Sequence, residues 1–393
     1  MAATELETGF VGRRAPLFRL AFVGSLLTIL TLGLYRFWMK SRLRRYYWSS
    51  ICPGGQPLEY VGLPQEKLVG FLIAVVFMAF YLGLANLALL YLSFSLLNTD
   101  VPAYALSLAG VVPLWFYASY RARRYILART RWRGIRFGVD RGAWGYVWRA
   151  MVHWLITLLS LGLLWPRMTF ALERYRAERT WFGSERLTQG GRWQMLYPAF
   201  LPVLGAVALG LIGAVVAARR DEVTGTVMVL AAGVVLAYGV VHYRVSAFRL
   251  LSETKTLGGL GFSVHPRPLR IFGVYVLGFL LAAVVIGAVF FGLVLLFFAL
   301  VPRGTPGALL QEGAGGDLPL LLTATLGVGA YVLFFFLWGV LRQGLITLPL
   351  LRHYTDTLRI SGALSLPDIH QRERDEMQHA EGFAEALDVG AAL

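Results

Sequence analysis

Long stretches without charged side chains constrain the fold of this chain more than any other feature. Only 15% of its 393 residues are charged and 57% are hydrophobic; the segments with almost no charge are 68–97, 196–217, 224–243, 271–301 and 320–341. A helix of about 20 apolar residues spans the hydrocarbon core of a bilayer, where every backbone polar group must be bonded internally. The segments do not alternate as barrel strands would. An all-α, polytopic membrane protein is therefore predicted.

The basic residues predict the orientation of the chain. The net charge is +15, and the Arg- and Lys-rich segments 36–67, 121–141, 167–192 and 244–270 flank the apolar stretches, whereas the connection 98–103 contains no basic residue. Cytoplasmic loops of membrane proteins carry the excess of Lys and Arg. We therefore expect these segments and both termini to be cytoplasmic, and we read the basic charge as topology and not as a nucleic-acid surface.

About six full transmembrane helices in three hairpins are predicted, within residues 68–120, 196–243 and 271–342. Two further apolar stretches, 17–35 and 146–165, have basic segments on both sides, so we expect them to dip into the membrane as re-entrant helices and leave on the same face. Hydroxyl side chains and a glycine lie in the middle of both stretches. The alternative is eight plain spans with an imperfect charge bias.

Internal repeats accompany this topology. Residues 28–35 match residues 157–164 at an offset of 129, and the openings Phe10-Val-Gly12 and Phe137-Gly-Val139 are alike. Parallel repeats of this kind occur in transporters. We predict three units, 1–136, 137–261 and 262–365, of which the third lacks a dipping segment, followed by an acidic cytoplasmic tail, 366–393.

Motifs for catalysis, cofactors and metals are not found. The chain has no phosphate-binding Gly-x-x-x-x-Gly-Lys-Ser/Thr loop, no His-Glu-x-x-His pair and no Gly-x-Ser-x-Gly elbow. Its one cysteine, Cys52, excludes a disulfide framework and a cysteine-cluster metal site. We expect no enzyme activity, no cofactor and no metal site.

Polar side chains inside apolar stretches are the first candidates for a functional site, because such groups are costly in a membrane and usually face the protein interior. They would form a ligand pocket or pathway between the repeats, and the alternative is interhelical hydrogen bonding. The candidates are His153, Arg149, Thr157, Ser160, Thr28, Thr31, His242 and Gln343.

A second set alternates arginine with aromatic residues near the ends of the apolar stretches, a combination suited to the headgroup layer and to anionic lipids. The alternative is topology and anchoring alone. The candidates for lipid headgroup binding are Arg42, Arg44, Arg45, Tyr46, Trp48, Arg121, Arg123 and Arg124.

The motif Phe10-Val-Gly12, residues 30–38 and residues 44–48 resemble the signature of the YjgN family of bacterial inner-membrane proteins, and residues 380–390 are similar to that family's ending. The resemblance covers nearly the whole chain. It implies a multi-pass protein of the bacterial inner membrane and no established activity. It also implies a membrane peptidase as one conceivable partner.

Two functions are predicted from these features. The first is movement or binding of a small solute or an anionic lipid through a pocket between the repeats. The second is a non-transporting scaffold or regulator of another membrane protein, in which the acidic tail would take part. Membrane lipids are the expected partners, with a protein partner or a homo-oligomer as further options, and an intramembrane enzyme ranks third.

Overall fold

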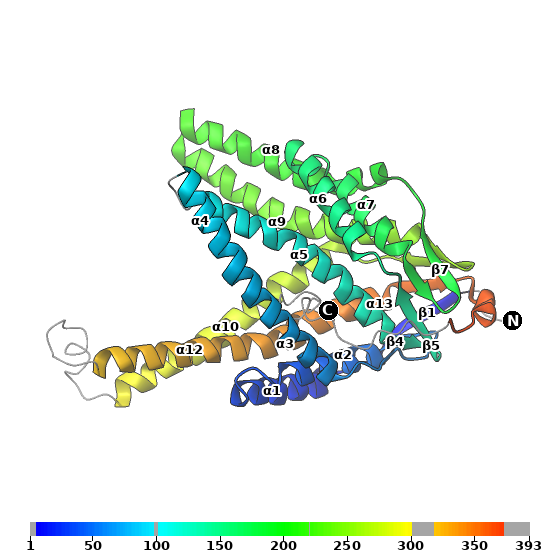
Figure 1. Cartoon of the computed structure of the whole chain (residues 1–393), viewed down its shortest axis with the longest axis horizontal. Helices are drawn as coiled ribbons and strands as arrows, with labels where there is room; N and C mark the ends of the chain where they lie inside the picture. Colours follow the sequence, from blue (N-terminus) through cyan, green and yellow to red (C-terminus); the bar gives the residue numbers. More distant parts are fainter. Residues whose placement is uncertain (1–4, 98–100, 220, 301–317, 373–393) are drawn as a thin grey trace. The chain divides into compact units, whose positions relative to one another are not determined.

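The computed structural model describes residues 5–97, 101–219, 221–300 and 318–372, and long helices dominate it (Figure 1). The α-helices are α1 (Arg14–Leu30), α2 (Arg36–Ser50), α3 (Pro64–Phe80), α4 (Asn86–Leu97), α5 (Val101–Ala128), α6 (Ala143–Leu159), α7 (Trp165–Ala177), α8 (Tyr197–Arg219), α9 (Glu222–Glu253), α10 (Pro268–Leu300), α12 (Leu318–Arg342) and α13 (Leu348–Asp356). Shorter helical turns are η1 (Tyr81–Ala85), η2 (Trp193–Leu196), η3 (Gln343–Thr347) and η4 (Ala363–Asp368).

Four helical segments in the described ranges are long and apolar enough to cross a membrane. They are Trp193–Arg219, Glu222–Glu253, Pro268–Leu296 and Ala324–Asp356, which overlap the second and third predicted hairpins and extend beyond their predicted bounds. The first predicted hairpin is helical as well, but the π-helical turn η1 divides its outgoing part into α3 and α4. The chain is thus a helical integral membrane protein, and the total of six spans stays a prediction.

Ten short strands form one antiparallel sheet, so the all-α prediction was incomplete. The strands are β1 (Glu5–Phe10), β2 (Ile51–Pro53), β3 (Glu59–Tyr60), β4 (Thr130–Trp132), β5 (Ile135–Val139), β6 (Thr180–Phe182), β7 (Glu185–Gln189), β8 (Lys255–Leu257), β9 (Leu260–Val264) and β10 (Leu358–Ser361). Their order in the sheet is β2-β1-β10-β9-β8-β7-β6-β5-β4-β3. Most of them lie in the Arg-rich segments and are too short to show a clear alternation of apolar and polar residues.

Five helical segments of the described chain connect strands of the sheet, and each is called an excursion here. The strand before an excursion pairs with the strand after it. Strands β1 and β2, which flank α1 and α2, pair at Phe10 and Ile51. Strands β5 and β6, which flank α6 and α7, pair at Phe137 and Phe182. The same holds for β3 with β4, β7 with β8, and β9 with β10. Every excursion therefore begins and ends at the same sheet.

The sheet curls around one apolar core. The Leu58 N–H donates to the Ile51 carbonyl at 2.9 Å, which joins the two end strands of the sheet through a hairpin turn. The buried core side chains come from both halves of the sheet and from the segment around η4, and include Trp132, Phe182, Leu257, Leu260, Ile360, Leu366 and Ile369. Burial of this apolar surface is the main force that holds the short strands together.

Two-residue turns with positive φ connect neighbouring strands. Gly258 and Gly259 have φ of 51° and 86°, and Arg133 and Gly134 have φ of 53° and 78°. Positive φ at both central positions is the type I′ turn, whose twist matches antiparallel strands. The glycines in these turns were the sequence signal for the sheet.

The two segments predicted to dip each consist of a helix, α1 or α6, that ends in the same kind of turn. Gly33 and Gly162 have φ of 94° and 86°. Their N–H groups donate to the carbonyl oxygens of Thr28 at 2.7 Å and Thr157 at 2.8 Å, respectively. These equivalent turns lie at the offset of 129 residues found in the sequence. The number and boundaries of the predicted repeat units nevertheless stay a prediction.

The described chain divides into two compact units. The first contains Met1–Gly12, Lys40–Phe272 and Arg352–Leu393, and therefore the whole sheet. The second contains Arg13–Met39 and Gly273–Leu351. Within the second unit, the Phe22 and Phe336 rings meet edge to face at 5.2 Å, which packs α1 against α12.

Candidate anion-binding site

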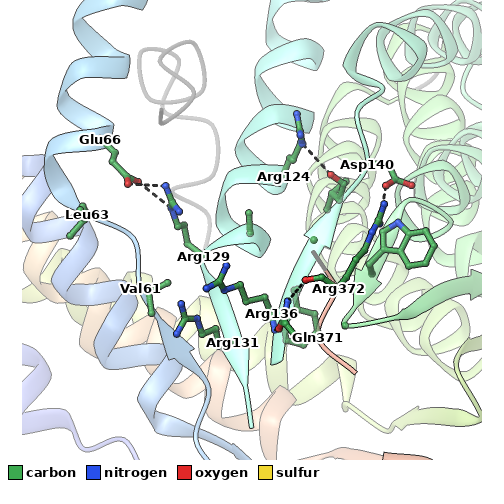
Figure 2. A pocket seen from close by; sticks show the side chains of 16 residues that line it. Val61, Leu63, Glu66, Arg124, Arg129, Arg131, Arg136, Asp140, Gln371 and Arg372 are labelled. Atoms are coloured by element: carbon green, nitrogen blue, oxygen red, sulfur yellow. Dashed lines mark hydrogen bonds and ion pairs between the residues drawn. The ribbon is translucent and has the colours of Figure 1, made fainter. Parts of the chain in front are cut away.

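An arginine-rich pocket of about 510 Å³ lies in the first unit, between the sheet and the ends of α3 and α5 (Figure 2). Its volume is typical of small-molecule sites. Five arginines line it: Arg124, Arg129, Arg131, Arg136 and Arg372. Among the described residues its two carboxylates are Glu66 and Asp140, so this part of the lining carries an excess of three positive charges.

The fold gathers these arginines from different elements. Arg124 lies in the last turns of α5 and Arg129 directly after it, while Arg131 and Arg136 face each other across β4 and β5. Like charges directly opposite on paired strands are destabilising. A pocket that collects them in this way has the charge of an anion-binding site.

The carboxylates neutralise only part of this charge. Glu66 accepts two hydrogen bonds from Arg129, at 2.8 and 3.2 Å, and one from the Tyr125 hydroxyl at 2.8 Å. Asp140 lies 3.5 Å from an Arg372 nitrogen. The Arg131 Nε is buried and has no hydrogen-bond partner among the described residues. A buried donor left unsatisfied costs free energy, so this arrangement of Arg131 lowers the stability of the folded protein.

The wall beside Asp140 is aromatic. Trp181 of β6 lines the pocket, and the Arg372 guanidinium lies 4.5 Å from the centre of its ring. The Trp181 Nε1–H is buried and likewise has no partner in the part of the chain that the structure describes. The pocket therefore offers guanidinium groups, which are donors only, and such a set suits phosphate or carboxylate oxygens.

A separate charged cluster joins α7 to the sheet. Glu173 lies 2.7 Å from the Lys255 ammonium of β8 and 3.0 Å from the Arg176 guanidinium. Burial alone would raise the pKa of the Glu173 carboxyl, but Arg176, Lys255 and Arg123 outweigh it and lower the pKa to about 2. Glu173 is therefore ionised at neutral pH and acts as the shared counter-ion of this cluster.

The pathway candidates from the sequence do not line the pocket. Thr28, Thr31, Thr157 and Ser160 stabilise the helical turns: Tyr35 N–H donates to the Thr31 hydroxyl at 2.9 Å, and Leu164 N–H to the Ser160 hydroxyl at 3.1 Å. The remaining four are placed separately. His153 accepts the Thr157 hydroxyl through its backbone oxygen, Arg149 lies over the Tyr175 ring, His242 Nδ1 lies 3.2 Å from the Ala199 oxygen, and Gln343 begins η3.

The candidates for lipid headgroup binding also lie at different places in the structure. Arg124 lines the pocket and Arg123 belongs to the Glu173 cluster. The others contact their own surroundings: Trp48 donates to Thr130 at 2.9 Å, Arg44 lies over Tyr60, Arg45 bonds the Gly62 oxygen, Arg121 bonds the Tyr117 hydroxyl, Tyr46 packs on Tyr47, and Arg42 lies on α2.

Most pocket residues were missed in the sequence. The signal was the density of eight arginines between Arg121 and Arg141, which was read as topology. Among the described residues, no group of three or more His, Cys, Asp or Glu side chains is placed to hold a metal ion.

Comparison with known proteins gives one family and one relative. A family model described as a bacterial protein of unknown function (DUF898) matches residues 5–288. Inner membrane protein YjgN from Salmonella typhimurium is 26% identical over 167 residues, which are 42% of this chain and 39% of the relative. The match thus spans less than half of that relative's length. No solved structure matches.

Proposed function

This chain belongs to the DUF898 family of bacterial proteins of unknown function, as its resemblance to the YjgN family predicted, and we propose that it binds a phosphate-bearing anion in its arginine-rich pocket. The carrying observation is the pair Arg131 and Arg136, directly opposite on β4 and β5 in a pocket with an excess of positive charge. Guanidinium groups bind phosphate oxygens with two parallel hydrogen bonds.

The phosphate has two sources in a membrane protein. It can belong to the headgroup of an anionic phospholipid, or to a small soluble molecule. Both present the same oxygens to the pocket, so binding of the phosphate is the shared step. Movement of the bound solute or lipid between the repeats is the further step that the sequence predicts. A scaffold or regulator of another membrane protein is the alternative, and its acidic tail lies outside the described residues from residue 373 on.

We also propose a multi-pass topology in the inner membrane, with both termini in the cytoplasm. The pairing of the strands that flank each excursion supports it, because one sheet cannot lie on both sides of a bilayer. Three excursions would cross and return, which makes six spans. The helices α1 and α6 would dip into one leaflet, and the leucines in the turns that follow them, Leu32 and Leu161, are 97% and 93% exposed.

The test is binding of phosphate by the protein in nanodiscs of zwitterionic phospholipid. Radiolabelled inorganic phosphate is titrated at constant ionic strength into the wild type, Arg131→Gln and the control Arg359→Gln. Arg359 lies on β10, outside the pocket, in an exposed pair with Glu7. We expect saturable binding that Arg131→Gln weakens at least about tenfold, while Arg359→Gln leaves it unchanged.

Two further measurements distinguish a lipid headgroup from a soluble ligand as the source of the phosphate. Nanodiscs with an anionic phospholipid should abolish phosphate binding if the headgroup occupies the pocket, and native mass spectrometry should then find this lipid retained by the wild type and lost from Arg131→Gln. Phosphate binding that is unaffected by the lipid assigns the site to a soluble ligand. Absence of both phosphate and lipid binding would overturn the proposal.

A further inference from the structure

The last described segment of the chain, Ile369–Arg372, runs along the arginine-rich pocket. It follows η4, and the side chains of Leu366 and Ile369 are buried in the core of the sheet. These two apolar anchors fix where the segment leaves the sheet. Gln371 and Arg372, which come next, both line the pocket (Figure 2).

The turn between β6 and β7 holds the segment close. The His370 N–H donates to the Ser184 hydroxyl at 3.2 Å. At Gly183, whose φ is 56°, an added Cβ would lie 2.4 Å from the His370 carbonyl oxygen. Only glycine fits there, because the two backbones pass each other at this point.

The contacts of Gln371 and Arg372 differ in kind. The Arg136 N–H donates to the Gln371 Oε1 at 2.9 Å, which is an ordinary hydrogen bond to the strand. Arg372 makes a long ion pair with Asp140, at 3.5 Å, and its side chain is 53% exposed. Exposed pairs with this geometry contribute little to stability. The guanidinium of Arg372 is therefore held by one weak ion pair and by its contact with the Trp181 ring 4.5 Å away, at the edge of a pocket with excess positive charge.

From this geometry we infer that Ile369–Arg372 is a strap that closes on the bound anion, with Arg372 exchanging its contact to Asp140 for a contact to the ligand. The inference rests on the proposed function and adds the regulation of that site. In the empty pocket the other arginines repel Arg372, and the ion pair with Asp140 keeps its guanidinium at the pocket edge. A bound anion offsets most of the positive charge of the other lining residues and offers Arg372 a negatively charged partner. Occupancy of the pocket is thereby coupled to the position of Ile369–Arg372.

The coupling makes opposite predictions for the two partners of the ion pair. Arg372→Gln removes a ligand contact, so it should weaken phosphate binding about tenfold. Asp140→Asn removes the competing carboxylate and a negative charge from the pocket, so it should tighten binding by a few fold. Arg359→Gln, an exposed arginine outside the pocket, is the control for the loss of one positive charge.

Accessibility of the strap is the second measurement. Gln371→Cys in a Cys52→Ala background carries one thiol, because Cys52 is the chain's only cysteine. Its reaction with a soluble maleimide should slow at least about threefold when inorganic phosphate saturates the pocket, since the closed strap shields the thiol. The same protein with Arg131→Gln should show no such slowing, and potassium chloride at equal ionic strength serves as the salt control.

Failure of this inference differs from failure of the proposed function. Suppose that phosphate binds the wild type in a way that depends on Arg131, that Arg372→Gln binds phosphate equally well, and that phosphate leaves the reactivity of the thiol unchanged. The inference about the strap would then be refuted, while the proposed anion-binding pocket would not. If phosphate and anionic lipid both fail to bind, the pocket and the strap are both overturned.

Discussion

The Tyr197 hydroxyl donates a hydrogen bond to the Leu163 carbonyl oxygen at 3.0 Å. Tyr197 is the first residue of α8, a helix long and apolar enough to cross a membrane, and Leu163 lies in the turn between α6 and α7. The tip of this hairpin is therefore tied to the start of a span. Such a position fits a shallow entry into one leaflet, because Trp and Tyr concentrate at the membrane surface.

Cysteine labelling tests this topology. Arg133→Cys and Ser184→Cys lie in the strand turns before and after α6–α7, and each is made in a Cys52→Ala background. Because β5 and β6 pair, both thiols should react with an impermeant maleimide only after the inner membrane is opened. Leu161→Cys, at the hairpin tip, should react slowly from both sides. Labelling of Arg133→Cys and Ser184→Cys from opposite sides of intact membranes would refute the dipping hairpin.

Glu173 should contribute strongly to stability. Glu173→Gln leaves Lys255 and Arg176 without their shared carboxylate, and loss of one partner from a buried ionic cluster costs about 3–5 kcal/mol. Glu178→Gln, directly after α7, is the control for an exposed carboxylate: it breaks the Arg174–Glu178 pair, worth less than about 1 kcal/mol. Thermal unfolding in one detergent compares the two variants with the wild type. Equal losses would contradict the assigned role.

The pH dependence of stability has a definite sign. The folded pKa of Glu173, about 2, lies below its ordinary value of 4.5. A lowered pKa stabilises the folded state above the ordinary value, and the contribution is lost as pH falls toward 2. Between pH 5 and 3 the midpoint of thermal unfolding should therefore fall more steeply for the wild type than for Glu173→Gln. If the midpoints of the wild type and Glu173→Gln fell in parallel with pH, another carboxylate would account for the pH dependence of stability.

The sequence predicted the membrane class and the helical turns because their causes are local. Charge-free segments require a lipid environment, and the glycines at 33 and 162 mark chain reversals. The sheet depends on pairing between distant segments: β1 pairs with β10 across nearly the whole chain. The pocket depends on it too, since Glu66, Arg131 and Arg372 meet only when the sheet has formed. Arginines near membrane spans satisfy the topology rule equally well, so their density alone did not reveal the pocket.

Alanine substitutions at two turn glycines distinguish destabilisation by backbone strain from destabilisation by close packing. Gly183 and Gly134 both have positive φ, 56° and 78°, so alanine is strained at either position by about 1 kcal/mol. An added Cβ meets nothing within 4 Å at Gly134, but lies 2.4 Å from the His370 oxygen at Gly183. Gly183→Ala should therefore lower the unfolding midpoint more than Gly134→Ala. It should also speed maleimide labelling of Gln371→Cys, and equal effects on labelling would contradict the close approach.

The opposed arginines should make the empty protein less stable than it could be. Arg131→Gln removes the positive charge directly opposite Arg136 and the unsatisfied Nε, so it should stabilise the protein in dilute buffer without phosphate by roughly 0.5–1 kcal/mol and raise the unfolding midpoint. Salt screens the repulsion over about 10 Å at 0.1 M, so the gain should shrink as potassium chloride is added.

Added phosphate should reverse the ranking of the two proteins. A ligand that binds only the folded state stabilises it in proportion to its occupancy, so phosphate at 100 times its dissociation constant contributes about 2.7 kcal/mol. The wild type should gain this stability, whereas Arg131→Gln should gain little. Arg359→Gln should respond to phosphate as the wild type does, because Arg359 lies outside the pocket. If Arg131→Gln instead destabilises the empty protein and keeps the full response to phosphate, Arg131 is a structural residue and the anion binds elsewhere.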